Sequence, residues 1–437
     1  NSTSTTGANA SGLFGFSQLT LPSMTLAAPY SSYFVMQPGV ITIAGAVYAS
    51  TISLTTIGQM NINANLIASA SGGTINISAG NFNASNPTIT AANVNITETS
   101  VTALASINNN WINGFINLNN NGSLQIATPA NSYFVLTADI AGTGATTAAT
   151  VTMTSANAGT IQFGGDNTYT GVTTINGGTY VNSYNGCATN ATCTTKSYFV
   201  VNDGGVFQFA GNSYFYANSA SDHVVTANSG GAIDLNGVTV TDGGARYFGI
   251  KLNGGTLTNT SANAAVLNVT YANGFLLGAD SYIGGNNGNI NILGYVAGAW
   301  GITKNGSNTV TLSNANTYAG TTTVSAGTLK LANAAALGTT AGGTTIRSGA
   351  VLDLNGQTIT NTEALTINGT GITNGGAVIN SSSSAASFAG LLTLGNDSSV
   401  VGETGAITIG NVGTISGAYN LTLGGTTGGT MNSIIGI

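Results

Sequence analysis

Apolar and polar residues alternate along most of this chain in short stretches that are separated by Gly or Asn. Every second position of such a stretch carries Val, Ile or Leu, and the positions between them carry Thr, Asn or Ser. The clearest stretches are 74–78, 94–97, 238–241, 290–292, 310–313, 407–409 and 421–423. Alternation with a period of two, bounded by turn residues, is typical of β-strands. Helical periodicity is scarce, so the pattern predicts an all-β chain.

Internal repeats narrow the fold further. Residues 166–181 align without a gap with residues 315–330, and both segments contain Asn-Thr-Tyr-x-Gly-x-Thr-Thr-(Val/Ile)-x-x-Gly-Thr. A second pair, 231–237 and 349–356, shares the sequence Asp-Leu-Asn-Gly. Recurring segments of this kind indicate a repeat architecture, in which each unit packs on the next.

The first pair resembles the strand repeats of bacterial autotransporter passenger domains, the secreted parts of type V systems. The resemblance implies a right-handed parallel β-helix, also called a β-solenoid, and it implies export. Residues 424–437 do not resemble the translocator barrel of that family. Either the barrel was removed or this protein is exported differently. Because the first residue is Asn1, we expect a processed chain.

Composition independently suits a β-solenoid rod. Only 4% of the residues are charged, and none of the first 97 is Lys, Arg, Asp or Glu. In a solenoid, turns of roughly 20 residues stack about 4.8 Å apart, so like charges would lie directly over one another and repel. We expect aliphatic side chains inside and Thr and Asn ladders outside. We also expect an uncharged N-terminal module at 1–97, followed by a repeat-bearing β-helix at 98–437.

Charge and hydropathy exclude several classes of partner. The net charge is −6, and the six basic residues are scattered, whereas phosphate binding needs clustered Lys and Arg. No run of 18 apolar residues is present, so we expect neither nucleic acid binding nor membrane insertion. Few titratable groups also predict a stability that is almost independent of pH.

Two cysteines, Cys187 and Cys193, flank a short polar loop. A disulfide between them would close a small ring and contribute about 2 kcal/mol. Such a bond persists mainly outside the cytosol and agrees with a secreted or cell-surface protein. Two free thiols on a surface loop are the alternative.

Candidates for chemistry are few. His223 is the only histidine, and in Ser-Asp-His neighbouring side chains on a strand point to opposite faces, which precludes a catalytic triad. One His and two loop Cys cannot supply four zinc ligands. We therefore expect no metal site, no cofactor and no enzymatic activity.

A β-helical polysaccharide lyase or hydrolase is the enzymatic alternative. Such an enzyme needs paired carboxylates on neighbouring turns. Asp222 and Asp242 are 20 residues apart, about one turn. Asp203 and Asp234 are further candidates, but Asp234 and Asp353 occupy matching Asp-Leu-Asn-Gly segments, which favours a role in turns.

These observations predict an extracellular structural protein that forms a surface fibre, sheath or matrix. Open strand edges at the ends of a solenoid template association, and both ends of the chain are apolar. We expect a head-to-tail homopolymer with contacts at Leu13, Phe14, Phe16, Ile434, Ile435 and Ile437. The alternative is a monomeric adhesin of the autotransporter type that binds a surface glycan or a host protein.

Overall fold

A computed structural model describes most of the chain. The structure describes the backbone alone at some of these positions. They are the described residues within 10–36, 81–88, 97–98, 111, 119–121, 142–143, 213–215 and 242. The described residues are 10–14, 18–21, 24–25, 31–36, 40–56, 59–68, 73–79, 81–84, 88–98, 111–112, 115–130, 132–137, 139–143, 149–154, 159–164, 169, 171–182, 198–211, 213–215, 225–242, 249–269 and 274–436.

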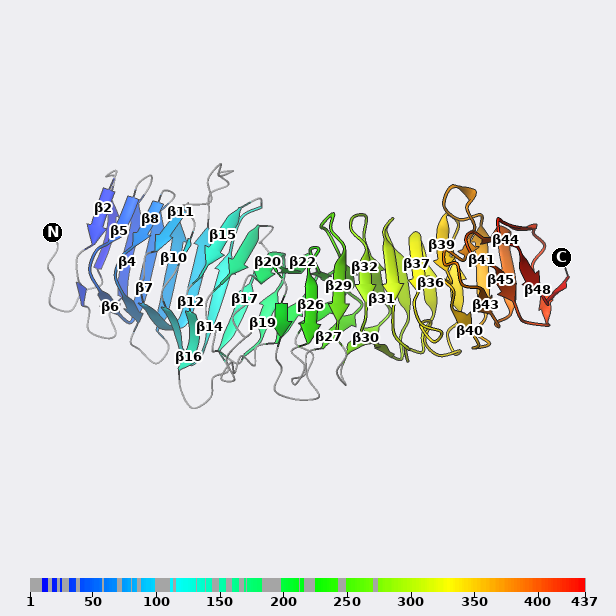
Figure 1. Ribbon diagram of the computed structural model, residues 1–437. Helices are drawn as coiled ribbons and strands as arrows, with labels where there is room; N and C mark the ends of the chain where they lie inside the picture. The colour runs from blue at the N-terminus through cyan, green and yellow to red at the C-terminus, as the bar shows by residue number, and fades with distance from the viewer. Residues whose placement is uncertain are drawn as a thin grey trace. The chain divides into compact units, whose positions relative to one another are not determined.

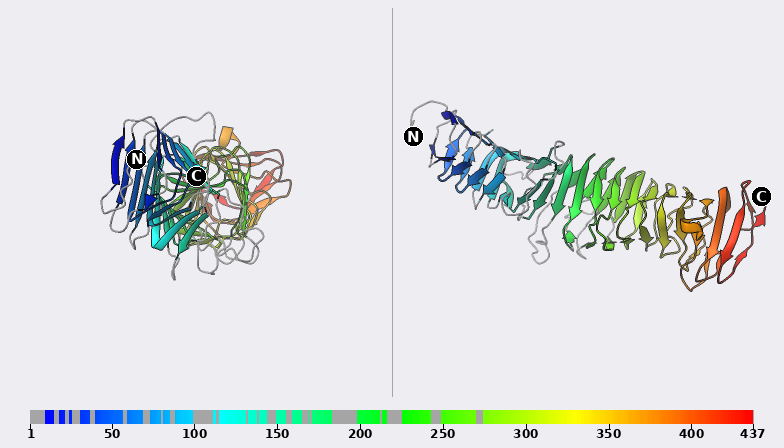
Figure 2. Two further views of the ribbon diagram at one scale, coloured as in Figure 1. Left: turned by 90° about the vertical axis from the view of Figure 1, so that its left-hand side faces the viewer. Right: turned by 90° about the horizontal axis from the view of Figure 1, so that it is seen from above.

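The chain forms two compact units, Asn1–Ala210 and Gly211–Ile437. In each unit, short strands from successive turns of the chain pair side by side and in parallel (Figure 1). We call one such turn a coil. Figure 2 shows the same stacking of coils within each unit from two further directions. The predicted β-solenoid is therefore confirmed. The module boundary at residue 97 stays a prediction.

The first unit consists of short strands throughout its described ranges. They are β1 (Ala10–Phe14), β2 (Gln18–Leu21), β3 (Met24–Thr25), β4 (Ser31–Met36), β5 (Val40–Ile43), β6 (Val47–Ala49), β7 (Thr51–Thr56), β8 (Gln59–Ile62), β9 (Leu66–Ala68), β10 (Thr74–Ala79), β11 (Asn81–Ala84), β12 (Thr88–Glu98), β13 (Trp111–Ile112), β14 (Phe115–Ala127), β15 (Tyr133–Leu136), β16 (Asp139–Thr143), β17 (Thr150–Met153), β18 (Thr160–Phe163), β19 (Thr173–Ile175), β20 (Gly178–Asn182), β21 (Phe199–Val201) and β22 (Gly205–Phe209).

The length of a coil varies more than the predicted value of roughly 20 residues. Thr51 of β7 pairs with Thr74 of β10, and Thr74 pairs with Asn93 of β12. Asn93 then pairs with Ser123 of β14, 30 residues later, because β12 and β14 are long strands with a register shift between them. The register shift within these two strands accommodates the extra residues of this coil.

Inside and outside positions follow the predicted alternation. Ile52 and Ile75 are in register and fully buried. Beside them, polar side chains are bonded in an outward ladder: the Asn76 amide donates to Ser53 Oγ at 3.2 Å, and the Asn95 amide donates to Asn76 Oδ1 at 2.7 Å. The prediction of aliphatic ladders inside and polar ladders outside is confirmed here.

Aromatic rings replace aliphatic side chains in the last coils of the first unit. The rings of Phe163 and Tyr180 lie 4.5 Å apart, and the ring of Phe207 lies 5.3 Å from that of Tyr180 on the other side. In the Tyr133–Phe134 pair, Tyr133 is 43% exposed and Phe134 is fully buried, since neighbouring residues on a strand face opposite sides. Most of these rings therefore fill the core.

The second unit has the same construction of short parallel strands. It contains β23 (Ser213–Phe215), β24 (Val225–Asn228), β25 (Ala232–Asp234), β26 (Thr239–Asp242), β27 (Ile250–Asn253), β28 (Thr256–Thr258), β29 (Ala265–Asn268), β30 (Phe275–Ala279), β31 (Ser281–Gly284), β32 (Ile290–Ile292), β33 (Val296–Gly298), β34 (Ile302–Asn305), β35 (Thr309–Leu312), β36 (Thr322–Val324), β37 (Gly327–Leu331), β38 (Thr344–Ile346), β39 (Ala350–Asp353), β40 (Thr358–Ile359), β41 (Leu365–Gly369), the 3-10 helix η1 (Ile372–Asn374), β42 (Val378–Ile379), β43 (Ala386–Phe388), β44 (Leu392–Gly402), β45 (Ile407–Ile409), β46 (Thr414–Ile415), β47 (Leu421–Gly425), β48 (Gly429–Met431) and β49 (Ile434–Ile435).

A column of outward threonines runs along the second unit. Its members pair in register from coil to coil: Thr303, Thr323, Thr345, Thr366 and Thr393. From Thr323 onward, each threonine pairs with a threonine of the preceding coil. A charged side chain at these positions would lie over its own kind and repel it, which explains the low charge of the chain.

Candidate functional site

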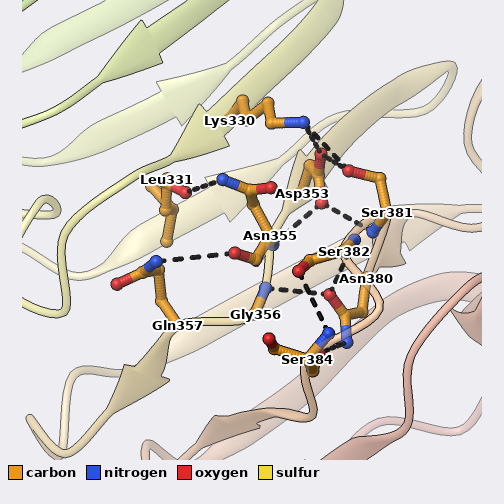
Figure 3. A network of polar contacts seen from close by, with 10 residues as sticks. All are labelled: Lys330, Leu331, Asp353, Asn355, Gly356, Gln357, Asn380, Ser381, Ser382 and Ser384. Atoms are coloured by element: carbon orange, nitrogen blue, oxygen red, sulfur yellow. Dashed lines mark hydrogen bonds and ion pairs between the residues drawn. The ribbon is translucent and has the colours of Figure 1, made fainter.

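Asp353, in the second Asp-Leu-Asn-Gly segment, organises a turn at the end of β39 (Figure 3). Its Oδ1 accepts hydrogen bonds from the backbone N–H groups of Asn355 (2.9 Å) and Ser381 (3.1 Å). Its Oδ2 accepts from the Ser381 hydroxyl at 2.6 Å and lies 3.4 Å from Lys330 Nζ. The carboxylate is 2% exposed, so it joins three coils at one buried point.

Asn380 completes this turn from the following coil. Its Oδ1 accepts from the Gly356 N–H at 2.8 Å, and its amide donates to the carbonyls of Ser384 (2.8 Å) and Ala406 (3.0 Å). Asn355 and Gly356 both have positive φ, 44° and 73°, a conformation that Asn and Gly adopt most readily. This explains why the turn carries Asn-Gly.

Asp234 repeats the arrangement in an earlier coil. Its Oδ1 accepts from the backbone N–H groups of Asn236 and Thr260, each at 2.9 Å, and its Oδ2 accepts from the Thr260 hydroxyl at 2.5 Å. Asn259 then plays the part of Asn380, because its Oδ1 accepts from the Gly237 N–H at 2.8 Å. The two segments therefore build one turn module twice, as the sequence predicted for Asp234 and Asp353.

These contacts decide what the carboxylates can do. A general base needs a free lone pair directed at a substrate, but both oxygens of Asp234 and Asp353 accept hydrogen bonds from the protein's own groups at 1–2% exposure. Asp203 is exposed on a turn before β22. The backbone of Asp242 lies in β26, and Asp222 and His223 lie outside the described residues.

Metal ligands are equally sparse. Among the described ranges, no three His, Cys, Asp or Glu side chains lie close enough together to hold a metal ion. The described part also contains no helix that is long and apolar enough to cross a membrane. Cys187 and Cys193 lie outside the described residues, so their pairing stays a prediction.

The repeated Asn-Thr-Tyr segments share a buried hydrogen bond. Tyr318 and Thr322 are 0% and 1% exposed, and their hydroxyl oxygens lie 2.6 Å apart. In the other copy, Tyr169 and Thr173 are equally buried, with hydroxyl oxygens 2.5 Å apart. The spacing of four residues between Tyr and Thr therefore closes a polar contact inside the coil.

Asn316 adds a link between coils. Its Oδ1 accepts from the Val296 N–H of the preceding coil at 2.8 Å, and its amide donates to the Ala336 carbonyl of the next coil at 2.6 Å. Gly320, two residues after Tyr318, has no room for a side chain, because a Cβ there would lie 2.2 Å from the backbone of Gly301. Asn316 and Gly320 therefore allow neighbouring coils to stack closely at this corner.

Lys304 and Glu363 are also buried in the second unit, and the sequence pattern did not single out either. The Lys304 ammonium donates to the carbonyls of Asn305 and Gly306, both at 2.8 Å, and to that of Ala326 at 3.0 Å. Burial lowers the pKa of Lys304 to about 8. Glu363, 1% exposed, accepts a hydrogen bond from the Thr344 hydroxyl at 2.5 Å.

The coil formed by β47, β48 and β49 carries three exposed aliphatic side chains. On one side these strands pair with β44, β45 and β46, and within the described residues no strand pairs with their other side. Leu423, in register with the buried Val400, is 53% exposed, and Ile434 and Ile435 are 62% and 55% exposed. We call this surface the open coil.

A shallow apolar hollow accompanies the open coil. It has a volume of about 260 Å³, and its apolar lining comes from Val400, Ile407, Ile409, Leu423 and Met431. These side chains have the inward pattern of a solenoid core. A further coil in register would bury them.

The predicted assembly residues fall into two groups. Ile434 and Ile435 lie on the open coil, and their role in assembly stays a prediction. Leu423 was not singled out, because its alternating pattern is that of a buried strand. Leu13 and Phe14 lie in β1, in register with Val35 and Met36 of β4. Phe16 and Ile437 lie outside the described residues, as do the side chains of Leu13 and Phe14.

Comparison with known proteins identifies the repeats. The family model of the passenger-associated-transport-repeat matches residues 153–179 and 302–331. The two matches contain the Tyr169–Thr173 and Tyr318–Thr322 pairs, and each begins before the aligned segments that the sequence had revealed. The predicted resemblance to autotransporter passenger domains is therefore confirmed. Neither the curated proteins nor the solved structures gave a match to the chain.

Proposed function

We propose that this protein is an exported, non-enzymatic structural protein whose solenoids join end to end to form a fibre, sheath or matrix at the cell surface. Support for export comes from the two passenger-associated repeats on a β-solenoid. Support for assembly comes from the open coil. The occupant of that surface is a second copy of this chain.

The open coil carries both groups that strand addition needs. The unpaired sides of β47, β48 and β49 present backbone N–H and C=O groups, and exposed strand edges recruit further strands. Leu423, Ile434 and Ile435 add apolar area, which contributes about 25 cal/mol for each Å² removed from water.

The complementary surface is formed by β1, β2 and β3. Within the described residues each of these strands pairs on one side, with β4, β5 and β6 respectively, in the same parallel sense as the strands of the open coil. The proposed contact between β47–β49 of one copy and β1–β3 of another is heterologous, because it joins two different surfaces. Such a contact propagates into a filament.

Sedimentation velocity over a concentration series tests this assembly. The double variant Ile434→Lys/Ile435→Lys places two charges on the open coil, whereas Thr339→Lys/Thr340→Lys adds the same charges at exposed turn positions of the same unit. We expect the native chain and the turn variant to form larger species as concentration rises, and the open-coil variant to remain monomeric. Unchanged assembly of the open-coil variant, or a native chain that stays monomeric, would overturn the proposal.

A monomeric adhesin is the second candidate, and exposed aromatic side chains favour it. Tyr282 and Trp300 are 45% and 47% exposed in the second unit. Exposed aromatic rings provide flat apolar faces on which sugars or partner proteins pack. This candidate predicts a monodisperse chain that binds glycans saturably, with binding lost in Trp300→Ala.

The enzymatic alternative depends on Asp222 and Asp242. Supporting a non-enzymatic role, the carboxylates of Asp234 and Asp353 serve as turn anchors. Cleavage of a polysaccharide by the native chain, lost in Asp222→Asn and Asp242→Asn, would contradict that role.

A further inference from the structure

A buried polar cluster crosses three successive coils of the second unit. Thr322 of β36 pairs in register with Thr344 of β38, so both threonines lie in one column inside the solenoid at 1–2% exposure. The Tyr318 and Thr322 hydroxyl oxygens lie 2.6 Å apart. At the other end, Thr344 donates to Glu363 Oε1 at 2.5 Å. The cluster therefore ends on a carboxyl group two residues before β41.

Glu363 is the unusual member of this cluster. The side chain is 1% exposed, and its second oxygen, Oε2, is buried with no hydrogen-bond partner among the described residues. A carboxylate with one unsatisfied buried oxygen is costly, whereas a neutral carboxyl group is tolerated far better. Burial raises the pKa of Glu363 from its ordinary 4.5 to about 7, and the Thr344 hydrogen bond opposes this shift.

No cation compensates for a negative charge at this position in the described structure. The titratable group that faces Glu363 is Tyr318, whose own pKa rises mainly by burial and in part through Glu363. From the following coil, Gly390 packs against the Glu363 carbonyl. The Lys304 ammonium is bonded to three backbone carbonyls, and Arg347 is exposed on the outside.

We propose that Glu363 is a pH-operated latch: protonated, it holds the coils between β36 and β41 closed, and its ionisation loosens them. The folded unit keeps the Glu363 proton between pH 4.5 and about 7, where the unfolded chain has released it. The stabilisation is therefore complete below pH 4.5 and is lost as the pH rises through 7. Glu363 changes charge in the folded unit near pH 7, and Lys304 in the preceding coil, whose pKa burial lowers to about 8, changes charge above that.

Hydrogen exchange of backbone amides in β36, β38 and β41 measures this loosening locally. After correction for intrinsic base catalysis, we expect the native chain to lose roughly tenfold to a hundredfold protection between pH 5 and 8. Glu363→Gln keeps the shape and removes the charge, so its protection is expected to be the same at both values. Glu403→Gln makes the same change at an exposed acid of the same unit and is expected to behave like the native chain. Parallel profiles for the native chain and Glu363→Gln would overturn the proposal.

A second variant tests the latch without replacing the acid. Thr344→Val removes the hydrogen bond that lowers the pKa of Glu363, so the midpoint of the pH-dependent loss of protection moves to higher pH. An unchanged midpoint would contradict the latch even if Glu363→Gln failed to fold. The measurement uses concentrations at which the chain is monomeric, so its outcome does not depend on assembly.

Discussion

The two passenger-associated repeats, 153–179 and 302–331, share one buried bond and differ in what lies over it. In both, a tyrosine hydroxyl contacts a threonine hydroxyl four residues later. In the first, Thr173 pairs in register with Phe199, and in the second, Thr322 pairs with Thr344. The same motif thus supports an aromatic core in one unit and a polar cluster that leads to Glu363 in the other.

This difference shows that the motif defines the coil in which it lies and leaves the next coil free to vary. The Phe199 ring lies 5.2 Å from the Tyr180 ring and 4.9 Å from the Phe207 ring. Phenylalanine has no ionisable group. Thr344 carries a hydroxyl that binds Glu363. The coil after the first copy therefore places an aromatic ring over the motif, and the coil after the second places a hydroxyl that contacts a buried acid.

Phe199 and Thr344 pair in register with the threonines of the two motifs, Thr173 and Thr322. Truncating them is expected to lower the free energy of unfolding more than the other substitutions considered. Phe199→Ala empties a packed aromatic site and is expected to cost about 3–5 kcal/mol in the first unit. Thr344→Ala removes one hydrogen bond and is expected to cost about 1–3 kcal/mol in the second. Urea unfolding followed by fluorescence separates the units, because Trp111 lies in one and Trp300 in the other. Equal losses in the free energy of unfolding would contradict the distinction between an aromatic core and a polar cluster.

The turns anchored by Asp234 and Asp353 allow two copies of one module to be compared within the second unit. Asp353→Asn and Asp234→Asn each replace an accepting oxygen with an N–H₂ group that faces donors from the next coil. We expect each to lower the free energy of unfolding by about 1–3 kcal/mol. Trp300 fluorescence in urea measures both. A loss below 0.5 kcal/mol, on the order of an ordinary surface substitution, would contradict the anchoring role.

The smallest effect is expected at the shared bond. Tyr169→Phe and Tyr318→Phe remove one hydroxyl each and leave the ring in place, so each is expected to cost about 1 kcal/mol. The two losses should be similar, because the tyrosine hydroxyl contacts a threonine hydroxyl in both copies. A clear difference between them, read from the fluorescence of Trp111 and Trp300, would show that the repeats are not equivalent at this point.

Local patterns in the sequence predicted much of this structure. Alternation predicted the buried ladders, and the Asp-Leu-Asn-Gly segments predicted that Asp234 and Asp353 anchor turns, because these features involve residues close together in the chain. The sequence did not predict the roles of Asn259 and Asn380, because the glycine N–H groups that they bind lie 22 and 24 residues away in the chain. That separation depends on the length of each coil, which varies.

Glu363 illustrates a different limit. A single acid in a chain of polar residues has no sequence signal for burial, and its partner Thr344 lies 19 residues earlier, one coil away. The prediction of pH-independent stability counted titratable groups and did not weigh where they lie. One carboxyl group inside a coil can outweigh several on the surface.

Electron microscopy of the purified chain over a concentration series tests the central claim most directly. The account predicts filaments that lengthen as concentration rises and that are absent from Ile434→Lys/Ile435→Lys. Single particles of the native chain at every concentration would contradict end-to-end assembly and would favour the monomeric adhesin.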